Sequence, residues 1–206
     1  MKKFVVVAAL LLSYLSNAQN AEPQYSIEAM YGMNSATPPT IQGFSHFDIG
    51  ARYMWDELWG VKVSYGHDKF DPSLPANGGT TYSRFSVEGV HNLGRTLMVP
   101  DYTNGYGNLL AHAGLGYSAL TSNINDGVDN IGNVIVGLTP QIYITEQLTF
   151  NLDASFILNV TQHFNFDGTY PNNADNAQMS FNGKMFNLSA GFTFYLGKGR
   201  SDNDWR

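Results

Sequence analysis

Seven charged residues recur inside segments that otherwise alternate apolar side chains with small or polar ones, and they are the first candidates for chemistry. They are Glu28, Asp48, Arg52, Lys62, Arg84, Glu88 and Asp153. All share one parity with polar residues such as His112, Gln141 and Asn151, so they project to one side of their strands. Charges of both signs on an enclosed face predict an internal ion-pair network, because a buried charge needs a partner. The alternative is a gate, in which the network has two arrangements and opens a narrow ion path. The sequence does not assign individual partners.

Residue spacing gives little support for catalysis or metal binding. The five histidines occupy different segments without HExxH or comparable metal spacing: His46, His67, His91, His112 and His163. The chain has no GxSxG motif and no phosphate loop, and Asp153 lacks a second carboxylate at a spacing suited to acid–base catalysis. We therefore expect no enzymatic activity, no metal and no cofactor. Because active sites also assemble from separate strands, an acyl-transferring or proteolytic site that uses His112 or Asp153 is the alternative.

Alternation and turn signals predict eight strands. Their ranges are 24–33, 44–55, 59–70, 81–93, 109–120, 132–144, 148–164 and 182–196. Most are about 10 to 15 residues long, above the ~5–6 of a globular strand and enough for the ~9–11 that cross a bilayer at a tilt. The composition agrees, since 21 Gly, 12 Tyr and 13 Phe with only 14% charged residues suit pleated strands joined by turns. The predicted fold class is all-β, an eight-stranded antiparallel up-and-down transmembrane β-barrel of the outer membrane. A soluble lipocalin-type barrel is the main alternative.

The connections between these strands alternate in length. Long ones are expected at 34–43, 71–80, 121–131 and 165–181, and very short ones at 56–58 and 145–147. Outer-membrane barrels have long outer loops and short periplasmic turns, so both mature termini are expected in the periplasm. Residues 94–108 break this rule and are an ordinary long turn or a partner-contact segment. Pro140 lacks a backbone donor, so a bulge or a fraying strand is expected there.

The N-terminus has the pattern of a secretory signal peptide. Lys2 and Lys3 precede the apolar run 4–12, and the small-x-small site 16–18 predicts cleavage after Ala18. Residues 19–196 would form the barrel and 197–206 a short periplasmic tail. Loss of the two lysines leaves 9 Lys and Arg against 17 Asp and Glu, a formal net charge of −8, which argues against nucleic acid as a partner. The chain has no Cys, so no lipoprotein anchor or disulfide is available.

Apolar residues of the opposite parity are expected to face lipid, with aromatic side chains at the interface. The predicted aromatic girdle consists of Tyr53, Trp55, Trp59, Tyr143, Phe194 and Tyr195. Such a girdle would fix the vertical position of the barrel in the bilayer.

Five segments in the same order resemble the N-terminal barrel of the outer membrane protein A (OmpA) family as it occurs in Bacteroidota-type bacteria. They are 49–70, 90–97, 109–120, 131–144 and 191–198, and the likeness covers nearly the whole mature chain. The stretch SDNDW (201–205) is similar to the one that leads, in longer members, into a peptidoglycan-binding domain. This sequence stops at Arg206, so it is a barrel alone or a fragment. Ser189, Gly191, Phe194 and Leu196 resemble the C-terminal β-signal that the barrel assembly machinery reads.

The resemblance implies a non-enzymatic integral outer-membrane protein that supports the envelope and presents surface loops. Its partners would be outer-membrane lipid, the barrel assembly machinery during insertion and other outer-membrane proteins. Two alternatives stay open. One is an accessory subunit of a larger outer-membrane complex for assembly or transport, and the other is a narrow gated channel.

Overall fold

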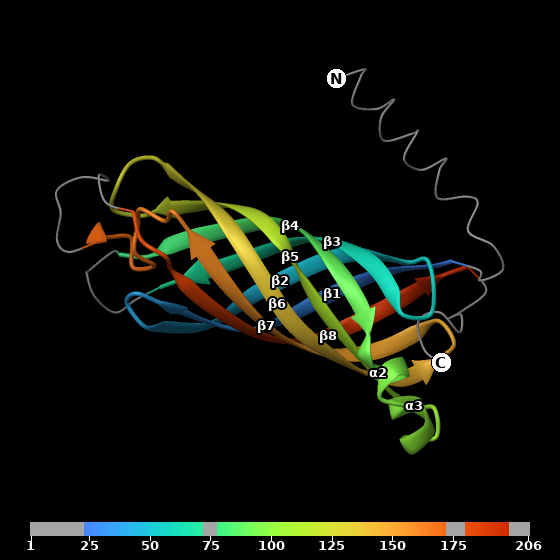
Figure 1. Cartoon of the computed structure of the whole chain (residues 1–206). Coiled ribbons are helices and arrows are strands. Elements are labelled where there is room, and N and C mark those ends of the chain that lie inside the picture. The colour runs from blue at the N-terminus through green and yellow to red at the C-terminus, as the bar shows by residue number, and fades with distance from the viewer. Residues whose placement is uncertain (1–22, 72–77, 172–179, 198–206) are drawn as a thin grey trace.

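The computed structural model describes residues 23–71, 78–171 and 180–197 (Figure 1). Eight antiparallel strands follow one another around a closed barrel, in which the last strand pairs with the first. They are β1 (Gln24–Thr37), β2 (Ile41–Met54), β3 (Trp59–Phe70), β4 (Thr80–Asn92), β5 (Gly107–Ser122), β6 (Val128–Thr145), β7 (Leu148–Val160) and β8 (Lys184–Leu196). The predicted eight-stranded up-and-down barrel is confirmed. Closure leaves no strand with an unpaired edge.

The two ends of the barrel carry different connections. At the turn end, β1 begins, β8 ends, and residues 55–58, 93–106 and 146–147 join neighbouring strands. At the loop end, the connections are 38–40, 71–79, 123–127 and 161–183. The prediction of a long first loop at 34–43 is wrong, because β1 and β2 continue almost to the turn between them. Inward and outward alternation persists through Asn34 and Ser35, so the sheet extends beyond the apolar part of the strands.

The long connection 93–106, here called the helical connection, contains two short helices, α2 (Leu93–Thr96) and α3 (Val99–Tyr102). Figure 1 shows that it projects sideways from the barrel at the turn end instead of crossing between β4 and β5 as a tight turn. Among the described residues, no helix has both the length and the hydrophobicity required to cross a membrane.

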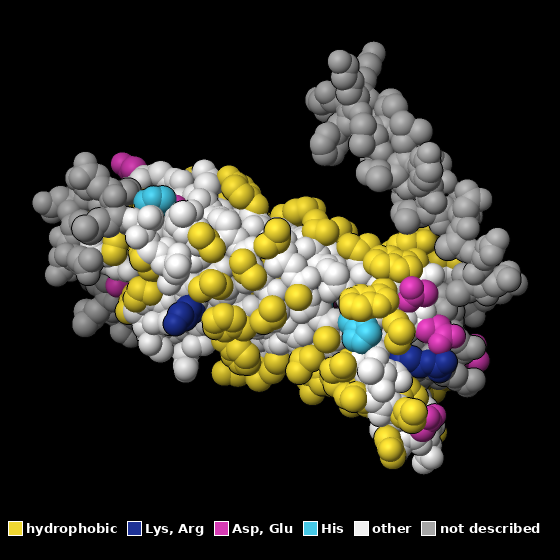
Figure 2. Space-filling model, in the orientation of Figure 1, with side chains coloured by type: hydrophobic (Ala, Val, Ile, Leu, Met, Phe, Trp, Pro, Cys, Tyr) yellow, Lys and Arg dark blue, Asp and Glu magenta, His cyan; other side chains and the backbone are white. Residues whose placement is uncertain are grey.

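Side-chain alternation gives the barrel an apolar outside and a polar inside. Phe85 is 57% exposed and Phe192 is 50% exposed, whereas the inward neighbour Thr193 is fully buried. Hydrophobic side chains cover much of the visible wall in Figure 2. A soluble barrel would place its polar side chains outside, so this arrangement suits a lipid environment around the wall.

Pro140 lies inside β6 and does not produce the expected bulge, although the recorded pairing with β7 is interrupted at Thr139 and Pro140. On the β7 side the recorded pairs pass from Leu138–Ala154 to Gln141–Asn151 without a change of register. The irregularity of this ladder lies further along, between Tyr143 and Thr145. The strand therefore loses its pairing with β7 only locally and keeps its alignment, so the prediction of a bulge at Pro140 is wrong.

The predicted signal peptide (1–18) and the tail beyond Gly197 lie outside the described residues. Their assignment stays a prediction.

Candidate functional site

The seven charged residues singled out in the sequence all lie in the barrel interior and are almost fully buried. Glu28 on β1 is shared by two cations: its carboxylate lies 3.1 Å from Arg52 Nη1 and 3.3 Å from Lys62 Nζ. The three residues come from consecutive strands, and the β2–β3 register places Arg52 directly opposite Lys62. The closed sheet therefore brings the two cations to one carboxylate.

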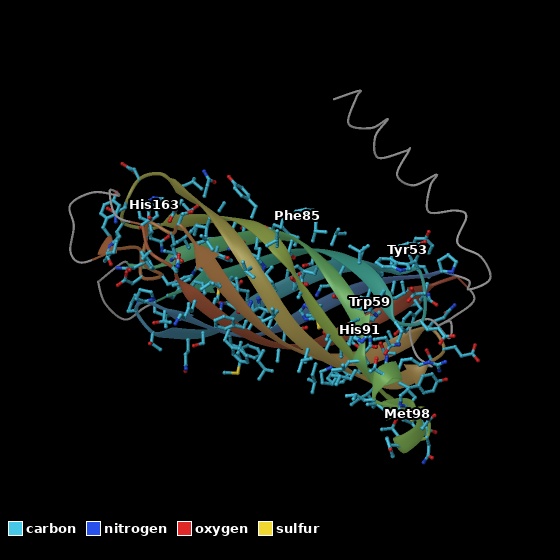
Figure 3. The ribbon with its side chains drawn as sticks, viewed as in Figure 1. Tyr53, Trp59, Phe85, His91, Met98 and His163 are labelled. Carbon is cyan, nitrogen blue, oxygen red and sulfur yellow. The ribbon has the colours of Figure 1, made fainter. Side chains whose placement is uncertain are left out.

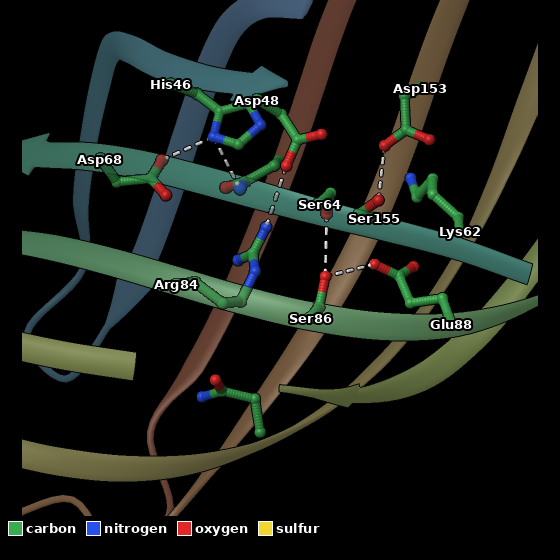
Figure 4. Close-up of polar contacts among 12 residues, drawn as sticks. His46, Asp48, Lys62, Ser64, Asp68, Arg84, Ser86, Glu88, Asp153 and Ser155 are labelled. Carbon is green, nitrogen blue, oxygen red and sulfur yellow. Dashed lines mark hydrogen bonds and ion pairs between the residues drawn. The ribbon is translucent and has the colours of Figure 1, made fainter. Parts of the chain in front are cut away.

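A second part of the network centres on His112 of β5. Its Nδ1 lies 2.5 Å from Glu88 Oε2 and its Nε2 lies 3.0 Å from Asp153 Oδ2. Serine hydroxyl groups donate further hydrogen bonds to these carboxylates. Ser86 donates to Glu88 at 2.7 Å and Ser155 donates to Asp153 at 2.5 Å (Figure 4). Both ring nitrogens thus face acceptors, and the serines donate to carboxylates.

This geometry bears on the catalytic alternative. A nucleophilic serine requires a neighbouring base that accepts its proton, usually an imidazole nitrogen. Both nitrogens of His112 already face carboxylate oxygens. The arrangement holds charges in place and does not form a serine–histidine pair.

A third part of the network joins the predicted residues Asp48 and Arg84 to residues that were not predicted as site residues from the sequence. His46 Nδ1 lies 2.9 Å from Asp68 Oδ1, and Asn34 and Asn187 supply further amide contacts to this pair. Arg84 approaches Asp48 at 3.9 Å in a long ion pair (Figure 4). His46 and Asp68 have the inward parity of their strands, so alternation contained the signal that would have found them.

Among the described residues, the buried carboxylates are those of Glu28, Asp48, Asp68, Glu88, Asp129 and Asp153, and the buried cations are Arg52, Lys62 and Arg84. Removal of one partner from such a network would leave an uncompensated buried charge.

Apolar clusters lie in the interior toward both ends of this network. At the loop end, eleven buried residues form one cluster: Ala36, Ile41, Phe70, Tyr82, Leu120, Ile131, Ile135, Ile157, Phe164, Phe166 and Met185. Phe166 comes from the last loop and lies against Phe70, with ring centroids 5.0 Å apart. At the turn end, Met54, Val90 and Leu110 pack together.

Between these clusters the free volume is small. The cavity among the charged residues holds about 10 Å³, which is close to the space of a single water molecule. An eight-stranded barrel is expected to be filled by its own side chains, and this one is. The charged residues therefore leave room for little more than one water molecule between them.

The loop end is joined into one surface by hydrogen bonds between connections. Gly79 N–H donates to Asp167 O at 2.7 Å, and Asn123 N–H donates to Gly79 O at 3.0 Å. Ser122 Oγ and Asn125 Nδ2 both donate to the carbonyl of Gly168. At the rim, His163 Nδ1 lies 2.8 Å from Asp129 Oδ1. The described parts of three separate loops thus have fixed relative positions.

Four of the six predicted girdle residues project outward near the turn end: Tyr53, Trp55, Trp59 and Phe194. Figure 3 labels Tyr53 and Trp59 at this end. Tyr25 adds to them, since its ring lies 4.7 Å from that of Tyr53. Tyr143 lies between the outward residues Ile142 and Ile144 and therefore has the inward parity of β6, so the prediction that it belongs to the girdle is wrong. Tyr195 is fully buried. Its neighbour Phe194 points outward, so alternation turns Tyr195 into the interior. The prediction that Tyr195 belongs to the girdle is wrong.

The four residues of the suggested β-signal lie on β8, the strand that closes the barrel against β1. Phe194 and Leu196 face outward, and Ser189 faces inward. A side chain at Gly191 would place its Cβ 2.0 Å from the Ala29 carbonyl oxygen. Gly191 therefore has a packing role at the seam between the first and last strands.

No His, Cys, Asp or Glu grouping within the described ranges is arranged to hold a metal ion. The interior carboxylates and imidazoles contact one another instead.

Comparison with known proteins identifies the fold alone. No family model and no curated protein matches the chain. Among solved structures, Neisserial surface protein A aligns with a TM-score of 0.57 at 10% identity, over 85% of this chain and 99% of that one. A major outer membrane protein of Thermus thermophilus aligns with a TM-score of 0.50 at 12% identity, over 84% and 99%. The chain thus has the fold of the small outer-membrane β-barrels.

Proposed function

We propose that this chain is a non-enzymatic integral outer-membrane barrel with a structural role, whose wall lies in the bilayer and whose loop end presents a fixed surface. The observation that carries the proposal is the combination of an apolar outer wall with an interior that is filled and internally paired. Exposed apolar side chains such as Phe85 and Leu115 need a lipid environment. The polar side chains of the interior contact one another and are buried. The loop end is therefore the polar surface that stays accessible.

The proposed orientation places the turn end and both mature termini in the periplasm, with the loop end outside. The predicted signal peptide, cleaved after Ala18, supports export. The resemblance to Bacteroidota-type OmpA barrels supports the same location, and Ser189, Gly191, Phe194 and Leu196 are the proposed contact with the barrel assembly machinery.

Conductance in planar bilayers tests this proposal against the gated channel. The purified protein should give no steady ion conductance, because paired charges and apolar clusters fill the described interior. A general porin reconstituted in the same way is the positive control. Discrete, lasting openings that change in size on Arg84→Ala would contradict the structural role and favour the gated channel.

The accessory-subunit alternative predicts stoichiometric association in the native membrane. A tagged protein extracted from outer membranes in mild detergent should elute as a single barrel if the proposal holds. Elution in a defined complex of fixed composition would instead make this chain a subunit of that complex.

A further inference from the structure

The helical connection exposes large apolar side chains at the end of the barrel where short turns are the rule. Leu97 is 53% exposed, Met98 is 60% exposed and Tyr102 is 83% exposed. Side chains of this kind rarely stand together in water without a partner. The helical connection therefore presents a surface that suits an apolar or interfacial environment.

The helical connection is held firmly against the barrel. Arg95 forms an ion pair with Glu57 of the β2–β3 turn at 2.7 Å. Asn92 N–H donates to Leu58 O, and the Asn92 side chain accepts from Arg95 N–H. At the other end, Thr103 Oγ1 donates to Val99 O and accepts from Gly107 N–H. These contacts fix the direction in which the helices leave the wall.

That direction is sideways, at the depth of the aromatic residues of the turn end. Figure 3 places Met98 outward from Trp59 and His91, whose rings lie 4.4 Å apart. Tyr106, which is 61% exposed, packs its ring 6.1 Å from that of Tyr143 on β6. His91 lies on the outward face of β4 beside Trp59, and its Nε2 is 3.1 Å from Thr96 Oγ1 of α2, so the helical connection adjoins the outer wall at this point.

We propose that the helical connection lies on the periplasmic leaflet of the outer membrane, with Leu97, Met98 and Tyr102 immersed among phospholipid headgroups and the upper acyl chains. This inference rests on the proposed function. Beside a barrel embedded in a bilayer, the space next to the wall at this depth is the lipid interface. Tyrosine and apolar side chains favour that region, because the ring contacts apolar lipid while the hydroxyl contacts polar headgroups or water. The helical connection would resist tilting and vertical movement of the barrel.

Site-specific lipid quenching tests the proposal. Because the chain contains no Cys, single cysteines can be introduced at Tyr102→Cys and Leu97→Cys and labelled with an environment-sensitive fluorophore. The full-length protein is reconstituted in vesicles of phosphatidylethanolamine and phosphatidylglycerol, with and without lipid that carries a doxyl quencher near the headgroup. A label at Phe85→Cys on the outward wall shows whether the barrel is inserted in the bilayer. A label at Glu146→Cys in the exposed β6–β7 turn is the control for a position in water.

The doxyl lipid should quench both labels of the helical connection and the Phe85 label, and leave the Glu146 label bright. If only the Phe85 label is quenched, the barrel is inserted but the helical connection lies in water, and the inference is wrong. If the Phe85 label also stays bright, the proposed function itself fails and the inference fails with it. Shielding of the Tyr102 label in native membranes, but not in these vesicles, would overturn lipid as the occupant and favour a protein.

Discussion

At the scale of single residues, the interior depends on carboxylates that are shared between strands. Glu28 contacts Arg52 and Lys62 from two neighbouring strands, and His112 lies between Glu88 and Asp153. Because each of these groups is almost completely buried, water cannot replace a lost partner. Stability should therefore be most sensitive to changes that leave one charge without its counter-charge.

The substitution Glu28→Gln should lower the free energy of unfolding by about 3–5 kcal/mol, because it leaves two buried cations without their common carboxylate. Urea unfolding in lipid vesicles, followed by tryptophan fluorescence, measures the change. The matched control is Glu57→Gln, which removes a carboxylate from the exposed Arg95 ion pair and should cost less than about 1 kcal/mol. Equal losses in the two variants would show that the interior network contributes little.

Alternation indicated which charged residues turn inward but not which of them meet. The parity rule needs only the sequence, because successive strand side chains point to opposite faces. The meeting of Arg52 with Lys62, and of Lys62 with Glu88, depends on the register of β2, β3 and β4. The aromatic character of Tyr195 suggests a girdle residue, but strand alternation turns its side chain into the interior, because its neighbour Phe194 points outward.

At the scale of elements, the helical connection and the last loop are the two segments that depart from a simple barrel. Gly94 is buried where α2 meets β5, and Phe166 carries the last loop into the apolar cluster at the loop end. Each segment is held by several contacts with the barrel, and these two residues are buried where it meets the barrel.

The substitution Gly94→Val should loosen the helical connection and leave the barrel intact. A Cβ at Gly94 would lie 1.8 Å from Asn108 Oδ1 and 2.7 Å from Leu109 N, so the segment or the start of β5 must shift. Backbone hydrogen exchange over residues 93–106 should become faster in the variant. Gly132→Ala is the control, because a Cβ there meets no atom within 4 Å and exchange should stay as in the parent. Unchanged exchange in Gly94→Val would contradict the tight packing.

The substitution Phe166→Ala should destabilise the loop end by about 3–5 kcal/mol, as expected for the removal of a buried aromatic ring. Phe166 is fully buried against Phe70 and Tyr82, and its carbonyl accepts from Thr80 Oγ1 at 2.8 Å. Limited proteolysis of the folded protein should cut the last loop faster in the variant. The exposed loop residue Ile124, changed to Ala, supplies the control, with a proteolysis rate close to that of the parent.

At the scale of the whole molecule, closure of the sheet is the main source of stability. All eight strands pair on both sides, and β1 and β8 pair over Tyr25–Thr37. In hydrocarbon, unpaired backbone groups are too costly to expose, so a barrel opens only when the entire sheet comes apart.

The unboiled protein should therefore migrate faster than the boiled protein on a denaturing gel, because the closed barrel resists detergent until it is heated. The mobility of both samples, compared over a series of temperatures, gives the temperature at which the barrel opens. Glu28→Gln should lower that temperature and Glu57→Gln should not. Identical mobility before and after boiling would contradict a closed integral barrel.

The number of strands, their approximate bounds and the side toward which most side chains point could all be predicted from the amino-acid sequence. This was possible because strand alternation has a period of two and the lengths suit a bilayer. The ion-pair partners, the insertion of Phe166 and the sideways direction of the helical connection became known only from the folded barrel. These features depend on strand register, on sheet closure and on contacts between segments far apart in the chain, such as Arg95 with Glu57 and Thr80 with Phe166. No local pattern encodes such contacts, because they form only once the whole sheet has closed.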